Sequence, residues 1–233
     1  MRLDKILTLT GLTRSQARKA IAAGRAQVGG QPVRDAAFQA RPEEVTLDGA
    51  PMALPGEVTL MLHKPAGVLT ATEDRRLPTV LDFVPDFLKN RGFGPVGRLD
   101  RDVTGLVLLT TDGQLAHRLI SPRRRVEKVY LAQVEGRPLE AELEILRRGG
   151  VAFSDFVSLP AGAELTEDGL LRLTLTEGKY HEVKRLCAHI GHPVRSLKRL
   201  SIGGVGLDPT LAEGQCRPLT AEEEARLRAV AGL

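Results

Sequence analysis

Hydrophobic positions near the N-terminus recur at helical spacing. Leu3, Ile6 and Leu7 fall on one face of a predicted helix, and Gly11 is placed to end that helix. A second helix is expected over residues 13–23, because a threonine followed three residues later by a glutamine is the pattern of a capping box. The chain is therefore predicted to begin with two short helices.

Short strand-like runs follow these helices. Glycine turns at residues 29–30 and 48–49 separate the runs and predict small hairpins. Residues 51–56 hold two prolines and a glycine and are predicted to be a linker. The expected organisation is a small domain over residues 1–54 and a larger domain over residues 57–233.

Beyond residue 57, the hydrophobic positions form runs and alternations of strand length. The clearest alternation places Leu171, Leu173 and Leu175 on one face, opposite polar residues. Strands outnumber helices and many connections are short, which favours a mixed, largely antiparallel α+β domain flanked by helices over a doubly wound parallel one. Strands are predicted within residues 57–67, 105–113, 127–136, 170–178 and 194–205, and helices within residues 114–120, 180–191 and 221–231.

Composition narrows the class of protein. The 233 residues are 42% hydrophobic but only 3% aromatic, with no tryptophan, so the core must be aliphatic. The net charge of +4 is a modest signal for a polyanionic partner. Two cysteines, no signal-peptide pattern and no apolar run near the ~20 residues of a membrane span predict a cytoplasmic protein without membrane contact. Nothing in the sequence demands more than a monomer.

The second predicted helix carries a basic face. Arg14, Arg18 and Lys19 lie on this face, and Arg25 follows the helix. Such a face can bind a phosphate backbone, but basic helix faces are also commonly only solvated. Charge alone leaves both interpretations open.

The order of the N-terminal elements resembles the S4 RNA-binding domain. The likeness covers about the first fifty residues and includes the Arg2-Leu3-Asp4 start, the basic second helix and the hairpin at residues 28–30. The resemblance implies that this module binds structured RNA, with ribosomal RNA as the expected partner.

An aspartate in the larger domain stands between two arginines at the start of an apolar run. Asp100 lies between Arg98 and Arg101, and residues 105–109 form the run. Taken alone, a carboxylate in a polar turn is more often structural than catalytic. An enzyme that needs a permanently ionised carboxylate would have a reason for this arrangement.

Four sequence blocks resemble, in order, those of pseudouridine synthases. They are HKPAGVLT at residues 63–70, the aspartate block at residues 97–113, SPRRRVEKVYLAQVEG at residues 121–136 and EGKYHEVKRL at residues 177–186. Together with an S4-like module they resemble the bacterial branch that modifies small-subunit ribosomal RNA. The resemblance implies the pseudouridine synthase fold and the conversion of uridine to pseudouridine, and four ordered blocks are far more specific than one.

The resemblance implies roles for three residues. Asp100 is implied to attack C1′ of the nucleotide or to remove a proton from C2′, and both routes stay open. Lys184 is implied to keep Asp100 ionised, because burial disfavours a lone carboxylate. Tyr130 is implied to stack on the flipped target base. Since the reaction only breaks and remakes a glycosidic bond, neither a metal nor a cofactor is expected.

Other charged residues of these blocks are given secondary roles. Asp102 is expected to be an N-cap or the partner of a basic group. Glu182 stands where the family usually has glutamine, and its charge is expected either to weaken the pairing of Lys184 with Asp100 or to hold Arg185. The residues of the larger domain expected to contact RNA are Lys64, Arg98, Arg123, Arg124 and Arg185.

One stretch of the sequence is rich in residues that can bind metal. His181, Cys187, His189 and His192 crowd one stretch, but their spacing matches no standard zinc pattern and Cys187 falls on an apolar helix face. We therefore expect no metal there.

Two alternatives to a small-subunit synthase stay open. The same chemistry can act on large-subunit ribosomal RNA. A protein with this sequence can also be a catalytically inactive RNA-binding or ribosome-assembly protein.

Overall fold

The structure, a computed structural model, describes residues 1–10, 12–52 and 56–233. The predicted helix end at Gly11 and part of the predicted linker lie outside the described residues. The chain divides into two compact units, one of residues 1–57 and 84–93 and the other of residues 58–83 and 94–233. The prediction had placed residues 84–93 in the larger domain, whereas the short helix within them, η3 (Asp86–Arg91), contacts α1 of the smaller unit.

The smaller unit is a helix pair packed on a small sheet. Thr13 and Gln16 form the predicted capping box at the start of the second helix. Leu3, Ile6 and Leu7 are fully buried, as the helical spacing predicted. The four strands are antiparallel in the order β2-β1-β3-β4. The elements are α1 (Leu3–Leu9), α2 (Arg14–Ala22), β1 (Ala26–Val28), β2 (Gln31–Pro32), η1 (Pro42–Glu44), β3 (Val45–Leu47) and β4 (Ala50–Pro51).

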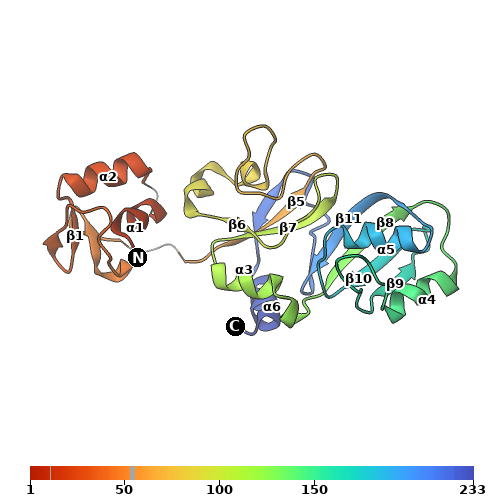
Figure 1. The fold of residues 1–233 in the computed structure, drawn as a ribbon. Helices are drawn as coiled ribbons and strands as arrows, with labels where there is room; N and C mark the ends of the chain where they lie inside the picture. The colour runs from red at the N-terminus through yellow and green to blue at the C-terminus, as the bar shows by residue number, and fades with distance from the viewer. Residues whose placement is uncertain (11, 53–55) are drawn as a thin grey trace. The chain divides into compact units, whose positions relative to one another are not determined.

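The larger unit is built on one nine-stranded sheet (Figure 1). Its main order is β13-β5-β7-β11-β8-β10-β9, with β6 paired to β7 and β12 paired to β11. All pairings are antiparallel except that of β7 with β11, so the predicted mixed, largely antiparallel sheet is confirmed. The strands are β5 (Thr59–Lys64), β6 (Gly94–Pro95), β7 (Thr104–Thr110), β8 (Lys128–Val134), β9 (Gly162–Leu165), β10 (Leu171–Leu175), β11 (Val194–Ile202), β12 (Val205–Gly206) and β13 (Cys216–Pro218).

The parallel pairing joins two halves of the sheet through a short junction. Only two residue pairs are in register there, Lys198 with Thr104 and Arg199 with Gly105. Gly105 has a φ of +105°, and a Cβ atom at this position would lie 2.3 Å from the backbone oxygen of Arg199. The glycine is therefore required both by its conformation and by the close approach of β11.

Helices cover one face of the β5–β7 half. Helices α3 (Gly113–Ile120) and α6 (Ala221–Ala231) pack together and bury a core with Met61, Leu106 and Leu108 of the strands (Figure 1). Both helices start at capping side chains, Asp112 for α3 and Thr220 for α6.

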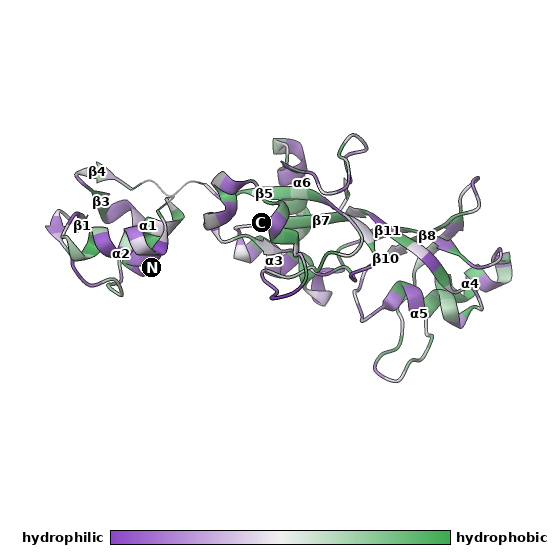
Figure 2. Ribbon diagram, turned by 90° about the horizontal axis from the view of Figure 1, so that it is seen from above, coloured by the Kyte–Doolittle hydropathy of each residue, from purple (hydrophilic) through white to green (hydrophobic). Residues whose placement is uncertain are grey.

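Strands β5 and β7 are buried on both faces. Every residue of β5 and all but the first of β7 are buried, and Figure 2 shows both strands as mostly apolar. Loops cover the face opposite α3 and α6, with Val68, Val80 and Leu99 among their buried residues. This second covered face carries the candidate site.

Two further helices belong to the other half of the sheet. Helix α5 (Glu182–His189) lies within the predicted helix at residues 180–191. It buries Val183, Leu186 and Cys187 and packs on β11. Helix α4 (Glu140–Arg148) was not predicted, although Leu143 and Leu146 are spaced three residues apart and buried. Short 3₁₀ turns, η2 (Val80–Phe83) and η4 (Pro122–Arg124), complete the unit.

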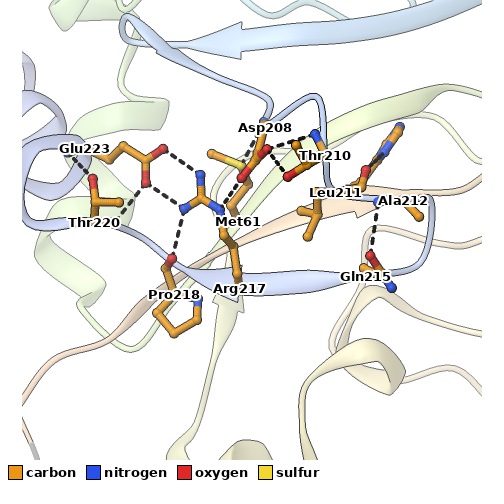
Figure 3. A network of polar contacts seen from close by, with 11 residues as sticks. Met61, Asp208, Thr210, Leu211, Ala212, Gln215, Arg217, Pro218, Thr220 and Glu223 are labelled. Atoms are coloured by element: carbon orange, nitrogen blue, oxygen red, sulfur yellow. Dashed lines mark hydrogen bonds and ion pairs between the residues drawn. The ribbon is translucent and has the colours of Figure 1, made fainter.

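A polar network fixes the C-terminal strand and helix (Figure 3). The guanidinium of Arg217 on β13 donates to Asp208 at 2.7 Å and to both carboxylate oxygens of Glu223 on α6 at 2.8 Å. The backbone N–H of Asp208 lies 3.3 Å from the sulfur of Met61 on β5. Bidentate pairing of this kind adds geometric precision, so the network fixes α6 to β13, the edge strand of the sheet.

Candidate active site

The loop that carries Asp100 lies between β6 and β7 and is called the aspartate loop. A buried ammonium group, that of Lys64, fixes its conformation. Lys64 is 0% exposed, and its Nζ donates to the backbone oxygens of Pro65 at 2.9 Å, Arg101 at 3.2 Å and Val103 at 2.7 Å. These three acceptors use all three ammonium donors. Burial lowers the pKa of Lys64 to about 8, although the negative charges of Asp102 and Asp100 oppose the shift.

Two other residues of the block at residues 63–70 also form hydrogen bonds with the aspartate loop. The hydroxyl of Thr70 donates to the oxygen of Leu99 at 2.9 Å and accepts from the Leu99 N–H at 3.1 Å. The N–H of Gly67 donates to the oxygen of Arg101 at 2.8 Å. The turn itself closes with the Val103 N–H on the oxygen of Asp100 at 3.1 Å. The block at residues 63–70 therefore positions Asp100 through the backbone on both sides of it.

Lys184 lies between two carboxylates. Its Nζ is 3.2 Å from Oδ2 of Asp100 and donates to both oxygens of Asp102 at 2.8 Å. The structure thus brings Lys184 to Asp100, and it gives Asp102 the second of its two expected roles, partner of a basic group. Burial acts to lower the pKa of Lys184, but the hydrogen bonds and charges of Asp102 and Asp100 outweigh it and raise that pKa. The hydrogen bond from Lys184 lowers the pKa of Asp102.

A histidine contacts the other oxygen of Asp100. Nε2 of His181 lies 3.4 Å from Oδ1 of Asp100. His181 precedes α5 with a φ of +51°, a left-handed conformation unusual for a residue with a side chain. Sequence reasoning had considered this histidine only as a metal ligand, although it stands in the same block as Lys184.

Tyr130 lies on the same face of the sheet as the aspartate loop. Lys64 of β5 pairs with Gly105 of β7, which pairs with Arg199 of β11. Arg199 pairs in turn with Tyr130 of β8, and Tyr130 with Leu173 of β10. Residues directly opposite one another in a sheet point to one face. Tyr130 therefore faces the side on which Lys64 holds the loop, two strands away from Gly105.

Arg199 is a buried cation in the middle of this row. It is 1% exposed, its Nε donates to the oxygen of Leu106 at 2.8 Å, and its Nη2 is buried without a hydrogen-bond partner among the described residues. Sequence reasoning missed Arg199, because an arginine on a strand is ordinarily exposed. Its charge contributes to lowering the pKa of Lys64, which places both cations under the same site.

Glu182 belongs to a buried carboxyl pair. It is 4% exposed, its Oε2 accepts from the N–H of Lys179 at 2.8 Å, and its Oε1 is buried without a partner among the described residues. Burial, together with the nearby buried carboxyl group of Glu177, raises the pKa of Glu182 to about 7. The group is therefore substantially protonated near neutral pH and adds less negative charge near Lys184 than expected. Arg185, which it was expected to hold, pairs instead with Asp155 at 2.6 Å.

One expected RNA contact is corrected by the structure. Lys64 was predicted to touch RNA, but its ammonium is enclosed by backbone carbonyls and cannot reach a phosphate. A lysine beside a proline loop looks exposed in sequence, and its burial follows only from the way the aspartate loop folds over it.

The other predicted RNA-binding residues lie at or near the surface. Arg14, Arg18 and Lys19 are exposed on α2 of the smaller unit, where Arg25 is also exposed but forms an ion pair with Asp48. In the larger unit Arg98, Arg123 and Arg124 are exposed. Arg185 is half-buried, with its guanidinium 4.5 and 4.8 Å from the ring centroids of Phe153 and Phe156. Their contacts with RNA stay predictions.

The residues considered as metal ligands have different surroundings. Cys187 is buried, and burial raises the pKa of its thiol to about 12, while His192 pairs with Glu142 at 3.0 Å. In the part of the chain that the structure describes, no group of three or more His, Cys, Asp or Glu side chains is arranged to hold a metal ion. Within those same residues no helix is long and apolar enough to cross a membrane.

The arrangement defines a class of enzyme before any relative is considered. A carboxylate fixed on a loop over a sheet and paired with a lysine can act as a nucleophile or base on a bound substrate without metal or redox chemistry. The sequence matches the family described as RNA pseudouridylate synthase over residues 58–189 and the S4 domain over residues 1–45.

Relatives and solved structures agree with these matches. The chain is 42% identical over 229 residues to ribosomal small subunit pseudouridine synthase A of Escherichia coli, covering 97% of this chain and 99% of the relative. It is 42% identical over 231 residues to the uncharacterized RNA pseudouridine synthase YtzG of Bacillus subtilis, covering 96% of each. A crystal structure of a pseudouridylate synthase matches with a TM-score of 0.70 at 37% identity, covering 97% of this chain and 99% of that one.

The chain therefore belongs to the family of RNA pseudouridine synthases, which are isomerases. It joins that catalytic fold to an S4 domain. The predicted enzyme class, fold and N-terminal module are confirmed.

The clamp under the aspartate loop gives a first prediction. Lys64→Met keeps the bulk of the side chain and removes its three hydrogen bonds, so Asp100 should shift by a fraction of an ångström or more. We expect turnover at saturating RNA to fall about 10- to 100-fold while RNA affinity stays within about twofold. Arg123→Ala, at an exposed site, should do the reverse. A Lys64→Met protein that lost affinity and kept its turnover would restore Lys64 as an RNA contact.

The buried carboxyl pair gives a second prediction. The folded protein holds a proton on Glu182 up to about pH 7, whereas the unfolded chain releases it near the ordinary 4.5, so the free energy of unfolding falls as pH rises between these values. In Glu182→Gln an amide can donate to Glu177 without a proton being taken up. The stability advantage of this variant over wild type should grow by on the order of 1–3 kcal/mol between pH 5 and pH 8.

Chemical denaturation of both proteins across that pH range measures the effect. Glu222→Gln, at an exposed position on α6, is the matched control and should change little with pH. A difference between Glu182→Gln and wild type that does not vary with pH would argue against a proton-sharing pair.

Proposed function

We propose that the protein converts a uridine of small-subunit ribosomal RNA to pseudouridine, with Asp100 as the reacting carboxylate. The observation that carries this proposal is the position of Asp100, on a loop fixed by Lys64 and with its two oxygens 3.2 Å from Lys184 and 3.4 Å from His181. A carboxylate held in this way has two basic groups beside it and little freedom to turn away from a nucleotide.

The chemistry needs only this carboxylate and a base that can turn over in place. The bond between N1 of uracil and C1′ breaks, and a new bond forms between C5 and C1′. The hydrogen on C5 leaves as a proton and N1 gains one, so the substrate and product are isomers. Asp100 either attacks C1′ or takes a proton from C2′, and the geometry is compatible with both routes.

Two other residues complete the proposed site. Lys184 pairs with Asp100 and provides a positive charge beside it when bound RNA excludes water from the site. Tyr130 stacks on the flipped base, and stacking contributes about 1–3 kcal/mol towards the cost of unstacking the nucleotide. All of these residues come from one chain, which supports a monomer as the active form.

The proposed substrate rests on the relatives and on the S4 domain. The Escherichia coli relative, 42% identical over nearly its whole length, is named for ribosomal small-subunit modification. We infer that Arg14, Arg18 and Lys19 on the exposed face of α2 bind RNA phosphates. These contacts provide affinity that does not depend on base sequence.

Two neighbouring carboxylates give a matched pair of variants. Asp100→Asn should abolish tritium release from small-subunit RNA labelled at C5 of uridine, while RNA affinity is kept. Asp102→Asn removes only the second partner of Lys184, so release should stay within about tenfold of wild type. Loss of activity in Asp102→Asn but not in Asp100→Asn would exchange their roles. Tritium release only from large-subunit RNA would show that large-subunit RNA is the substrate. No release by the wild-type protein from either RNA would indicate that it binds RNA without modifying it.

The basic face of the S4 domain is tested by salt. Arg14→Ala with Arg18→Ala should weaken RNA binding and reduce the slope of log affinity against log salt by up to about two, since each phosphate contact contributes roughly 0.7–0.9. Turnover at saturating RNA should be unchanged, because Asp100 lies in the other unit. Filter binding at several salt concentrations measures the slope, and an unchanged slope would exclude this face as a phosphate contact.

A further inference from the structure

Tyr180 is an aromatic side chain left largely in water. It is 72% exposed, in a chain whose aromatic content is 3% and which has only one other tyrosine, Tyr130. The rings of Tyr180 and His181 are stacked, with centroids 3.8 Å apart and planes inclined by 19°. One face of the tyrosine ring is therefore occupied by the imidazole, and the exposure of the residue leaves its other face open.

The stack leads directly to the candidate catalytic carboxylate. His181, the inner layer, is the residue whose Nε2 lies 3.4 Å from Asp100. Nζ of Lys184 contacts the same carboxylate at 3.2 Å. Any group that stacks on the outer face of Tyr180 is therefore separated from the reacting centre by two ring layers only.

The surroundings suit a nucleobase better than a protein surface. Tyr180 follows the exposed Lys179, whose Nζ lies 4.0 Å from Glu177 and 5.8 Å from the ring centroid of Phe156. In the sequence, the exposed Arg98 stands two residues before Asp100. A protein-docking patch needs a contiguous apolar area of several hundred Å², whereas Tyr180 is one aromatic ring between a lysine and a histidine. An exposed flat ring with basic residues nearby in the chain is the kind of platform by which proteins hold single-stranded RNA, through base stacking and phosphate contacts.

We propose that the open face of Tyr180 stacks a base next to the target uridine and so forms a second base-binding position beside the catalytic one. This proposal rests on the proposed function, since it takes RNA as the substrate at Asp100. The target base lies over the sheet with Tyr130, and the neighbouring base lies outside it on Tyr180. Holding the neighbour fixes the path of the RNA strand while the target is unstacked, and His181 links this position to the carboxylate.

The absence of tryptophan from the sequence permits a direct test. Tyr180→Trp in the full-length Asp100→Asn protein introduces a single indole at the proposed position. Titration with small-subunit ribosomal RNA transcript should quench its fluorescence as a base stacks on it. Leu139→Trp in the same background, at a position 67% exposed before α4, is the matched control and should not be quenched.

Affinity and turnover provide an independent measurement. Tyr180→Ala should weaken binding of the same transcript, or raise KM, roughly 5- to 150-fold, with turnover at saturating RNA changed much less. Tyr180→Phe keeps the ring and should behave like wild type. Wild-type KM in Tyr180→Ala, or an unquenched indole at position 180 in a protein that binds the transcript, would overturn the proposal.

The two proposals fail in different ways. If the wild-type protein releases no tritium from any ribosomal RNA, the proposed function is wrong, yet quenching of the indole would still support the stacking position. If wild type is active and Tyr180→Ala is equally active with an unchanged KM, the synthase stands and the second base position is rejected. If wild type is active on protein-free RNA but the indole at position 180 is not quenched, Tyr180 does not stack on a base of the substrate. This result also rejects the second base position.

Discussion

Three backbone carbonyl oxygens share the single ammonium group of Lys64 beneath the aspartate loop. An ammonium removed from water is unfavourable unless all its donors are used, and here all three are. Two of the acceptors, Arg101 and Val103, lie just beyond Asp100, so the buried charge can be satisfied only when this turn has one conformation. The position of the reacting carboxylate is thus set by a solvation requirement of another residue, and Thr70 and Gly67 reinforce it.

At the site, two carboxylates compete for the positive charge of one lysine. Asp100 and Asp102 share Lys184, and His181 supplies a second contact that becomes cationic only when the ring is protonated. A further ionised carboxylate nearby would compete for the same lysine. Glu182 reduces this competition because burial and Glu177 raise the pKa of its carboxyl to about 7, so that it is partly protonated near neutral pH. The substitution of glutamate for the usual glutamine is therefore electrostatically milder than the change of residue type indicates.

Much of this architecture follows from the sequence, and the remainder depends on contacts between distant residues. Period-two alternation identified β10, helical spacing identified α5, and four ordered blocks located Asp100 and Lys184. No local pattern reveals that Arg199 on β11 is buried, because its contacts are with residues distant in the sequence, such as Leu106. The burial of Lys64 was not predicted either, because it depends on Arg101 and Val103, which are distant in the sequence. The contact of His181 with Asp100 depends on a left-handed residue before α5, which periodicity does not encode.

The narrow parallel junction between β7 and β11 has a consequence for how the domain matures. Asp100 and Lys64 come early in the chain, Tyr130, Lys184 and Arg199 are synthesised later, and β13 and α6, which complete the half of the sheet that holds Lys64, are synthesised last. The two halves meet where Arg199 reaches the oxygen of Leu106, 93 positions away in the chain. Closing so large a loop is entropically slow compared with local hairpin formation. A nascent chain therefore carries an S4 domain well before it carries an assembled catalytic centre.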